Sequence, residues 1–395
     1  MDITVPISGV PSKMMPFHVV SKLVMPAINT TPLKGLVSPF AKRSPLALMF
    51  AAAKQGAVIN WGFTPDADEE NVASGFAPYS DAIDTKKYAV GSITLDKIKW
   101  KSEDRFQDFQ TIASPAEDPD GVILELAMRK YATRFVREVL EVFTFGGVGV
   151  QGRFTVGLNG SKPVAGRLFY GATDLGVYTP YAPNNGNDLK AQIEADLGAA
   201  TAKFTPELFR KINDEAVSKN HQYPLYPVKK FMGGGMFSEE QKFYCLAGTY
   251  PLQGLRINPD FKLEHYTNPH TWPDQASPIV SDRSVTTIGS IEIIKCSEMD
   301  TLTSFIVNGH TYDISIVMGG DALRMCQSSL ENGMKIVNDT DAFRIEHEER
   351  FSSLYSYFRG YKVPRYYNLQ TKAYNDGSDP EGLAEAGVIY IVTKR

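Results

Sequence analysis

The chain has 395 residues, of which 43% are hydrophobic and 22% charged, and its formal net charge is −4. This composition is typical of a globular protein and argues against a dedicated DNA-binding protein, while the absence of any run of about 18 apolar residues argues against a membrane span. Three widely separated cysteines without a CxxC pair argue against a disulfide framework and indicate synthesis in a reducing cytoplasm.

The first 45 residues cannot form a stable helix, because each proline removes a backbone donor and restrains the residue before it. Seven prolines fall in this segment: Pro6, Pro11, Pro16, Pro26, Pro32, Pro39 and Pro45. The residues between them are largely apolar, unlike those of a disordered tail. We therefore expect residues 1–45 to be an extended N-terminal arm, with a reach of about 150 Å, that lies on a partner subunit.

Charge is distributed unevenly along the chain. Residues 1–60 carry a net charge of +5, so the remaining 335 residues carry −9. A sparsely cationic arm on an acidic body favours weak, non-specific contact with nucleic acid or with an acidic partner.

Residues 46–92 are expected to form a short helix followed by an extended loop. The helix is predicted over Ala47–Gln55 and ends at Gly56. Residues 60–92 are then a polar excursion whose composition suits a long hairpin or loop, a kind of segment that is usually functional in compact proteins. An acidic cluster in it lacks the glycine and glutamate that a calcium loop needs, so a solvated loop tip is the favoured interpretation.

The strongest helix signal lies at residues 120–145. Asp118-Pro119 supplies an N-cap and a proline at the first helical position, and Gly146-Gly147 ends the segment. Apolar residues recur at helical spacing between these signals, at Leu124, Met128, Tyr131, Phe135, Val139 and Val142.

Beyond this helix the chain mixes strands and short helices. Residues 150–190 are glycine-rich and strand-like, and a second helix is predicted over Thr205–Asn220. Five further strands are predicted at 229–232, 243–247, 252–257, 290–296 and 312–318. A short helix is expected at 321–327, an extended aromatic and basic region at 342–372, and a last strand at 388–392. The class is α+β.

No motif points to chemistry. Gly147-x-Gly149-x-x-Gly152 follows a helix, so it cannot present phosphate to a helix N-terminus as a dinucleotide site does. His265 and His270 lack the compact spacing of a metal site. Aromatic and basic residues interleave at 355–367, which could be a single-strand-binding platform but is better explained by a twisted sheet with cross-strand pairs. We therefore predict no catalytic, cofactor-binding or metal-binding residues, no cofactor, and no enzyme.

The order of these elements resembles that of the major capsid proteins of tailed double-stranded DNA bacteriophages, the Hong Kong 97-type fold. Two phrases are also similar to that family, Ile288–Ser297 and Tyr312–Ala322. The resemblance implies an N-terminal arm, an extended loop (E-loop), a long spine helix, a P-domain and an A-domain. It maps the arm to 1–45, the short helix and loop to 46–92, the first part of the P-domain with spine helix 120–145 to 93–149, the A-domain to 150–284 and 310–344, and the rest of the P-domain to 285–309 and 345–395.

The resemblance also implies a function. The protein would self-assemble as hexamers and pentamers into an icosahedral virion head that encloses double-stranded DNA. Its partners would be a separate scaffolding protein and a portal, and a decoration protein could also bind the shell; maturation cleavage would not occur. The alternatives are a bacterial encapsulating compartment of the same fold, and an oligomeric ligand-binding protein or enzyme that uses residues 223–275.

Six side chains are our candidates for contacts between subunits. The alternative for Trp61 and Phe63 is a satellite core, and the alternative for the two arginines is a solvated helix face. The six are Phe17, Phe40, Trp61, Phe63, Arg134 and Arg137.

Overall fold

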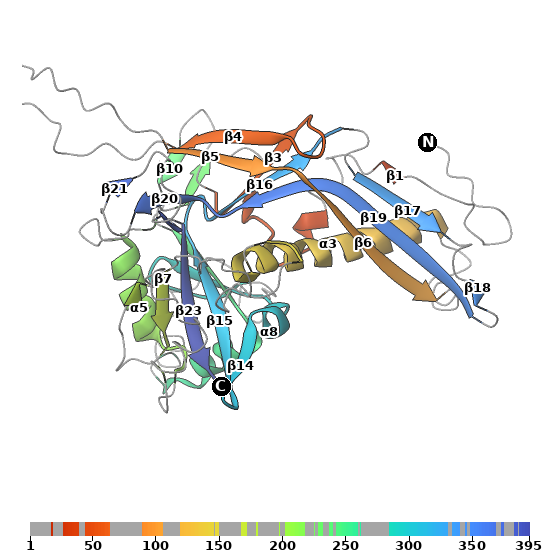
Figure 1. Ribbon diagram of the computed structural model, residues 1–395. Coiled ribbons are helices and arrows are strands. Elements are labelled where there is room, and N and C mark those ends of the chain that lie inside the picture. Colours follow the sequence, from red (N-terminus) through yellow and green to blue (C-terminus); the bar gives the residue numbers. More distant parts are fainter. Residues whose placement is uncertain are drawn as a thin grey trace, which may run out of the picture.

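Two large sheets and one long helix dominate the computed structural model of the chain (Figure 1). The structure describes residues 17–18, 27–38, 44–63, 89–105, 119–145, 147–149, 167–171, 179–180, 197, 202–217, 225, 228–231, 237–239, 242–259, 261, 284–330, 334–339, 344–345, 348–368, 373–374, 383–385 and 387–395. The α+β class is confirmed.

The first sheet, here called the β19 sheet, is built around the 15-residue strand β19. Its order is β1-β17-β19-β16-β3-β2, and β6 and β18 also pair with β19. The strands are β1 (Phe17–His18), β2 (Val37–Ser38), β3 (Leu46–Ala51), β6 (Asp96–Arg105), β16 (Leu323–Ser328), β17 (Met334–Asp339), β18 (Arg344–Ile345) and β19 (Glu348–Lys362).

The second sheet, here called the β15 sheet, has the order β12-β13-β11-β15-β23-β7-β8, with β14 paired to β15. Its strands are β7 (Arg167–Tyr170), β8 (Thr179–Pro180), β11 (Phe243–Ala247), β12 (Ser284–Ile288), β13 (Ile291–Lys295), β14 (Ser304–Val307), β15 (His310–Met318) and β23 (Val388–Lys394). The strands predicted at 243–247, 290–296, 312–318 and 388–392 are confirmed.

Three smaller sheets complete the strand inventory of the described residues. A hairpin joins β4 (Val58–Phe63) to β5 (Ala89–Thr94), and β9 (Lys229–Phe231) pairs with β10 (Phe237–Glu239). The third has the order β21-β20-β22, with β20 at Arg365–Asn368, β21 at Ala373–Tyr374 and β22 at Leu383–Glu385.

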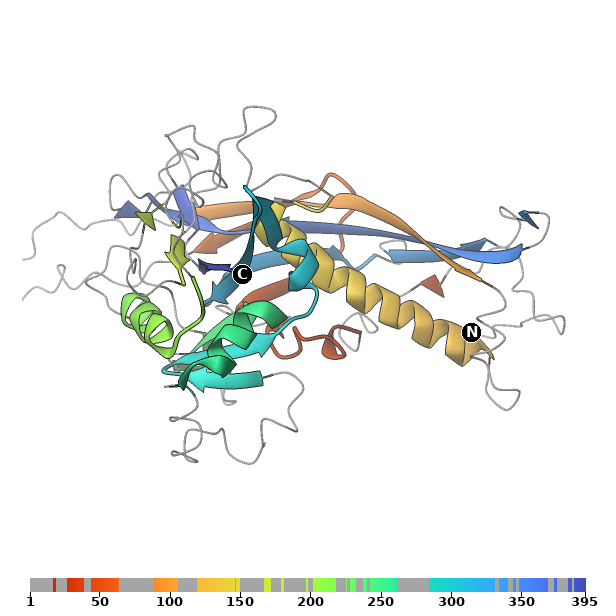
Figure 2. The same ribbon diagram turned by 90° about the horizontal axis from the view of Figure 1, so that it is seen from below.

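Helix α3 (Pro119–Phe145) lies along one face of the β19 sheet, as Figure 2 shows from below. The predicted helix at 120–145 is confirmed. Four residues of its predicted apolar stripe are at most 2% exposed, namely Tyr131, Phe135, Val139 and Val142. The helix buries more than this stripe, because Ala132, Val136, Leu140 and Phe143 are buried as well.

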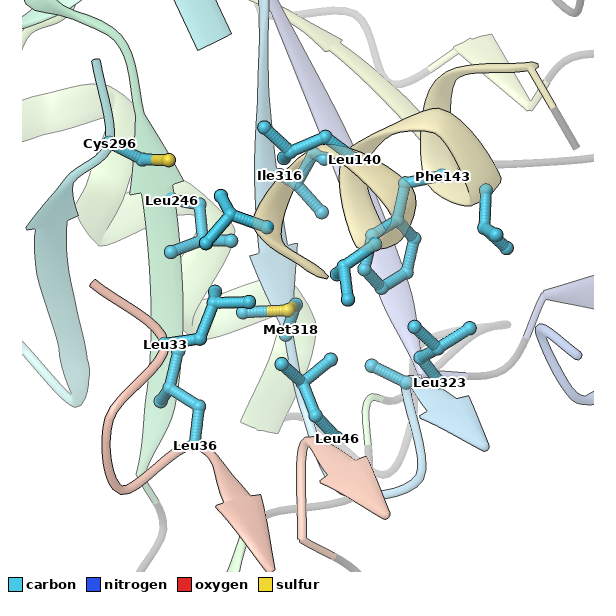
Figure 3. Close-up of a cluster of buried hydrophobic side chains, with 14 of the residues drawn as sticks. Leu33, Leu36, Leu46, Leu140, Phe143, Leu246, Cys296, Ile316, Met318 and Leu323 are labelled. Atoms are coloured by element: carbon cyan, nitrogen blue, oxygen red, sulfur yellow. The ribbon is translucent and has the colours of Figure 1, made fainter. Parts of the chain in front are cut away.

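The main core joins the two sheets through the C-terminal half of α3 (Figure 3). Leu140 and Phe143 of the helix belong to one cluster with Ile316 and Met318 of the β15 sheet. The same cluster contains residues of the β19 sheet, among them Leu46 and Leu323. One helix therefore packs against both sheets, and a single core joins them.

A second core lies on the other face of the β15 sheet, under α5 (Pro206–Val217) and α6 (Thr249–Ile257). Alternate β15 and β23 residues reach it, including Val317 and Ile391. The helix predicted at Thr205–Asn220 is confirmed over Pro206–Val217, and its start is fixed because the Leu208 backbone N–H donates to Thr205 Oγ1 at 3.2 Å.

Part of the expected arm folds into its own chain. Ala27, Ile28, Leu33 and Leu36 are at most 1% exposed and belong to the main core. The backbone of Leu46 also donates to Leu36 O at 3.2 Å, which holds this segment beside β3. Residues 27–37 therefore need no partner subunit to bury their apolar side chains, contrary to the expectation for the whole of 1–45.

Three predicted elements are wrong in type. Residues 46–51 and 323–328 are strands rather than helices, and they pair with each other in parallel, Leu46 opposite Leu323. Their alanine, leucine and methionine residues favour helix locally, but a strand that is covered on both faces is also a continuous apolar run. Conversely, the strand predicted at 252–257 is part of helix α6, whose buried residues Pro251, Leu252 and Leu255 share one face.

Strand pairing also differs from the expected division into domains. Residues 285–309 pair within the β15 sheet rather than with β6 and β19. Conversely, β16 and β17 lie in residues 310–344, which were expected to belong to the A-domain, but both strands pair with β19 of the expected P-domain. Strand β23 at the end of the chain pairs with β15 and β7. Residues 284–318 and 388–394 therefore belong with 243–247.

We predict that Leu33→Ala destabilises the subunit by about 2–5 kcal/mol, because the truncation leaves a cavity in the main core. Urea unfolding of the unassembled subunit measures this. Lys34→Ala is the matched control, since Lys34 is exposed in the same segment and its truncation should change the free energy of unfolding by no more than about 0.5 kcal/mol. Equal effects of the two substitutions would contradict the placement of residues 27–37 in the core.

Candidate functional site

A cluster of polar side chains is buried between α3 and the β19 sheet. At its centre Glu138 of α3 is 0% exposed and Arg359 of β19 is 1% exposed. The Arg359 Nη1 atom lies 3.1 Å from Glu138 Oε2, and both side chains of this ion pair are fully buried. Two charges in such a place are expensive to desolvate, so the pair must be held by further hydrogen bonds.

Neighbouring side chains supply those bonds. Arg359 Nε donates to Gln327 Oε1 at 3.0 Å, and the other guanidinium nitrogens donate to Gln327, Tyr131 and Tyr361. The hydroxyls of Tyr357 and Tyr361 both donate to the Glu138 carboxylate. Each charged group of the pair is therefore surrounded by groups of complementary polarity from α3, β16 and β19.

Aromatic rings enclose the guanidinium group. The Arg359 Cζ atom lies 4.6 Å from the centre of the Tyr357 ring, 5.1 Å from that of Phe135 and 5.3 Å from that of Tyr131. Tyr131 and Tyr357 also pack edge to face, with ring centres 5.8 Å apart. Cation–π attraction is strongest where water is excluded, so these rings add to the ion pair.

A second ion pair extends the cluster toward the end of α3. Arg134 contacts Glu138 at 3.3 Å and binds Glu141 with two nitrogens, at 3.1 and 3.2 Å. Glu141 in turn accepts a hydrogen bond of 3.0 Å from the backbone N–H of Gly149. Gly149 has φ of +71°, a conformation that suits glycine, and its contact ties the chain after the helix back onto the helix.

The surroundings change the titration of these groups. Burial raises the pKa of Glu138 to about 7, although the hydroxyls of Tyr357 and Tyr361 and the Arg134 guanidinium favour the ionised form. Burial and the nearby Glu138 raise the pKa of the Tyr357 hydroxyl well above its usual range. The tyrosines therefore remain protonated donors, and the cluster acts as a structural connection between α3 and the sheet.

The three cysteines are buried thiols. Burial raises the pKa of Cys296 to about 12 and that of Cys326 to about 11, and it raises that of Cys245 further. A thiol with such a pKa is a poor nucleophile at neutral pH.

The described part of the chain contains no cluster of metal ligands, that is, no group of three or more His, Cys, Asp or Glu side chains that could hold a metal ion. The acidic loop residues, His265 and His270 lie outside the described residues. No helix in the described ranges is long and apolar enough to cross a membrane.

The six candidate contact residues do not form one site. Phe17 is in β1, opposite Ile336 of β17, and Phe40 lies outside the described residues. Trp61 and Phe63 are in β4, opposite Gly91 and Ala89 of β5.

The two arginines are engaged within their own chain. Arg134 belongs to the buried cluster, and Arg137 lies 3.4 Å from Glu298, at the start of α8 (Met299–Leu302). Whether any of the six residues contacts another subunit stays a prediction.

The sequence did contain a signal for Glu138. It lies three residues after Phe135 and seven after Tyr131, a spacing that places it on the same face of the helix as these two buried rings. No comparable signal marks Arg359. A strand of alternating aromatic and basic residues has the same sequence pattern whether its basic side chains are buried or exposed. Arg359 is 1% exposed, so this basic residue of the aromatic and basic region does not reach solvent.

The fold of the whole chain is that of phage capsid proteins. It is similar to a chain of the cyanophage Pam1 capsid, with 11% identity, a TM-score of 0.57 and coverage of 99% of this chain and 98% of that one. It is also similar to the capsid of Ralstonia phage GP4, with 12% identity, a TM-score of 0.54 and coverage of 100% and 94%. The head of Helicobacter pylori bacteriophage KHP40 gives 12% identity, a TM-score of 0.53 and coverage of 92% and 90%.

Sequence comparison alone gives no such link, since no family model and no curated protein sequence matches the chain. The fold predicted from the order of elements is thus confirmed at an identity where sequence matching fails.

We predict that Arg359→Met destabilises the subunit by about 3–5 kcal/mol, because it leaves the Glu138 carboxyl buried without its cation. The double variant Glu138→Leu/Arg359→Met should be closer to the wild type, since no charge is left behind. A double-mutant cycle by urea unfolding measures both. Arg137→Met is the control, because its pair with Glu298 is partly exposed and should contribute about 1 kcal/mol or less.

We also predict that Glu138 makes the subunit less stable as pH rises. Its pKa is raised from 4.5 to about 7 on folding, so the folded chain binds more protons than the unfolded chain between these values. The stabilising contribution is complete below about pH 4.5 and is lost as pH passes about 7. Urea midpoints measured over this range should fall less steeply for Glu138→Gln than for the wild type, and parallel curves would contradict the assignment.

Proposed function

We propose that the protein is the major capsid protein of a tailed phage, a structural subunit that self-assembles into an icosahedral head around double-stranded DNA. The observation that carries the proposal is the extent of the fold match. The Pam1 capsid chain and this chain are covered over 98% and 99% of their lengths, so the likeness is not limited to a shared submotif.

The architecture of the chain supports a role in assembly. The β4–β5 hairpin carries a 25-residue connection between Phe63 and Ala89, which is long for a compact protein and typical of segments that bind partners. Contacts of such a segment with a different surface on the next copy are heterologous, and heterologous contacts close into rings. Hexamers and pentamers are rings of this kind.

The proposal has consequences for partners and location. The protein would reside in the virion after synthesis in the host cytoplasm, and its role would be structural rather than enzymatic. A separate scaffolding protein and a portal would join the many copies of the chain, and a decoration protein could bind the outside of the shell. An encapsulating compartment of the same fold is the second candidate, and it differs in holding a protein cargo instead of DNA.

We predict that the purified full-length chain, alone or co-expressed with its scaffolding protein, forms closed particles visible by electron microscopy and sedimenting as large assemblies. Deleting residues 2–25 should leave a folded subunit that forms few or no particles, because the deletion removes most of the arm but keeps the buried segment 27–37.

Circular dichroism and urea unfolding of the truncated chain provide the control for folding. A full-length chain that remains a small discrete species, or that carries a bound small ligand, would contradict the proposal. Particles filled with a protein cargo and free of DNA would favour the encapsulating compartment.

A further inference from the structure

Helix α3 turns one side away from the β19 sheet. Figure 2 shows the helix in front of the sheet, with residues 27–38 beside it and no other described element over most of its length. The opposite face of the sheet carries the β4–β5 hairpin, which packs Ile59 and Ile93 against Met49 and Cys326 of β3 and β16 (Figure 1). The two faces of the sheet are therefore covered by different elements, and the α3 side ends in the outer surface of the helix.

This outer surface of α3 is basic. Three of the described side chains of the helix are exposed, and they recur every four residues, at Arg129, Thr133 and Arg137. Residues at this spacing lie on one face of a helix, so the three form a stripe. Lys130 and Arg134 flank the stripe and are half-buried.

Acidic side chains of the same helix do not offset this charge at the surface. Glu138 is 0% exposed and binds Arg359 of the sheet, and the Glu141 side chain is only 12% exposed. Arg137 does contact Glu298 at 3.4 Å, but both side chains of this pair are partly exposed. Such a pair is weak, so Arg137 can exchange its partner for another anion. The stripe thus presents positive charge on a body that is acidic as a whole.

The segment beside α3 adds charge of the same sign. Residues 27–38 contain a single charged residue, Lys34, and it is exposed. No acidic residue occurs anywhere between Ile3 and Asn60 in the sequence. The chain that reaches this side of the subunit before β3 therefore adds to the positive charge and nowhere neutralises it.

The side chains of the stripe suit phosphate better than a protein surface. The centre of a protein interface is usually formed by apolar or aromatic anchors, but none of the exposed side chains described for α3 is apolar. Arginine, lysine and threonine are the side chains that contact phosphates in nucleic acid complexes. Arg129 and Arg137 are separated by about 12 Å along the helix axis, which corresponds to about three or four phosphates of one DNA strand.

We propose that the basic stripe of α3 binds the phosphates of double-stranded DNA without sequence preference. The inference rests on the proposed function, because it assigns the contact with packaged DNA to the α3 side of the subunit and turns the β4–β5 hairpin away from the DNA. Each subunit makes about three phosphate contacts, so its own affinity is in the low range of non-specific binding. Repetition over many subunits holds the DNA without fixing its path.

The test compares two variants of the full-length, unassembled subunit, each of which loses three positive charges. The first removes the stripe and is Arg129→Gln/Lys130→Gln/Arg137→Gln. The matched control is Lys54→Gln/Lys97→Gln/Lys99→Gln, in which three exposed lysines outside α3 are changed.

The control variant changes charge away from the α3 side of the sheet. Lys97 and Lys99 alternate along β6 with Ile98 and Trp100, which pack on the main core beside α3. Successive side chains of a strand point to opposite faces, so the two lysines point away from the helix. Circular dichroism of both variants checks that they remain folded.

Binding is measured by the fluorescence anisotropy of a labelled DNA duplex of about 20 base pairs over a range of salt concentrations. At about 50 mM salt the stripe variant should bind at least about tenfold more weakly than the wild type. Its plot of log K against log salt should be shallower by about 2–3, because each lost phosphate contact reduces the slope by about 0.9. The control variant should change the slope by less than about 1.

Equal losses in the two variants would overturn the proposal, because DNA would then respond only to net charge. A wild-type subunit that does not bind the duplex even at about 20 mM salt also overturns it. A polyglutamate peptide of about 20 residues is the third probe. If it binds more tightly than the duplex and loses this affinity in the stripe variant, the stripe is assigned to an acidic protein instead.

The proposed function is judged separately, by particle formation. A wild-type chain that binds the duplex through the stripe but forms no particles contradicts the proposed function and leaves the DNA contact standing. Closed particles from a chain whose subunits do not bind the duplex contradict only the inference about α3.

Discussion

The fixed position of α3 on the β19 sheet is the constraint on which the rest of the subunit depends. An apolar stripe alone would allow the helix to rotate or slide by small amounts, because apolar packing is not directional. Glu138 and Arg359 remove this freedom, since a shift of the helix would leave two charges buried without partners. Arg134, Glu141 and Gly149 then fix where the chain leaves the helix.

The same helix determines how the two sheets are joined. Its C-terminal half packs on both, so the relative position of the sheets follows from one rigid element rather than from a flexible linker. Residues 27–37 close this core from the N-terminal side (Figure 3). The apolar composition of residues 27–37 is therefore explained by the core of their own chain.

The parts of the fold that the sequence predicted are those set by local spacing. The stripe of α3 repeats over five turns, and strands such as 243–247 and 388–392 are short apolar runs with clear ends. Residues 46–51 and 323–328 could not be predicted in this way, because they are neighbouring strands that pair with each other from more than 270 residues apart, and β16 is also paired with β19 on its other side. The buried cluster was hidden for the same reason. Glu138 lay visibly on the stripe, but Arg359 became its partner only through the folding of β19 under α3.

The two kinds of charged contact in this chain suit different tasks. A buried, fully bonded pair such as Glu138–Arg359 costs several kcal/mol to break, and it holds an arrangement that must be correct once, in the subunit. Exposed pairs contribute only about 0.2–1 kcal/mol each and are screened by salt. Contacts of that strength can form and separate while a shell is being built, so misplaced subunits are released, yet repetition over many subunits makes the closed particle stable.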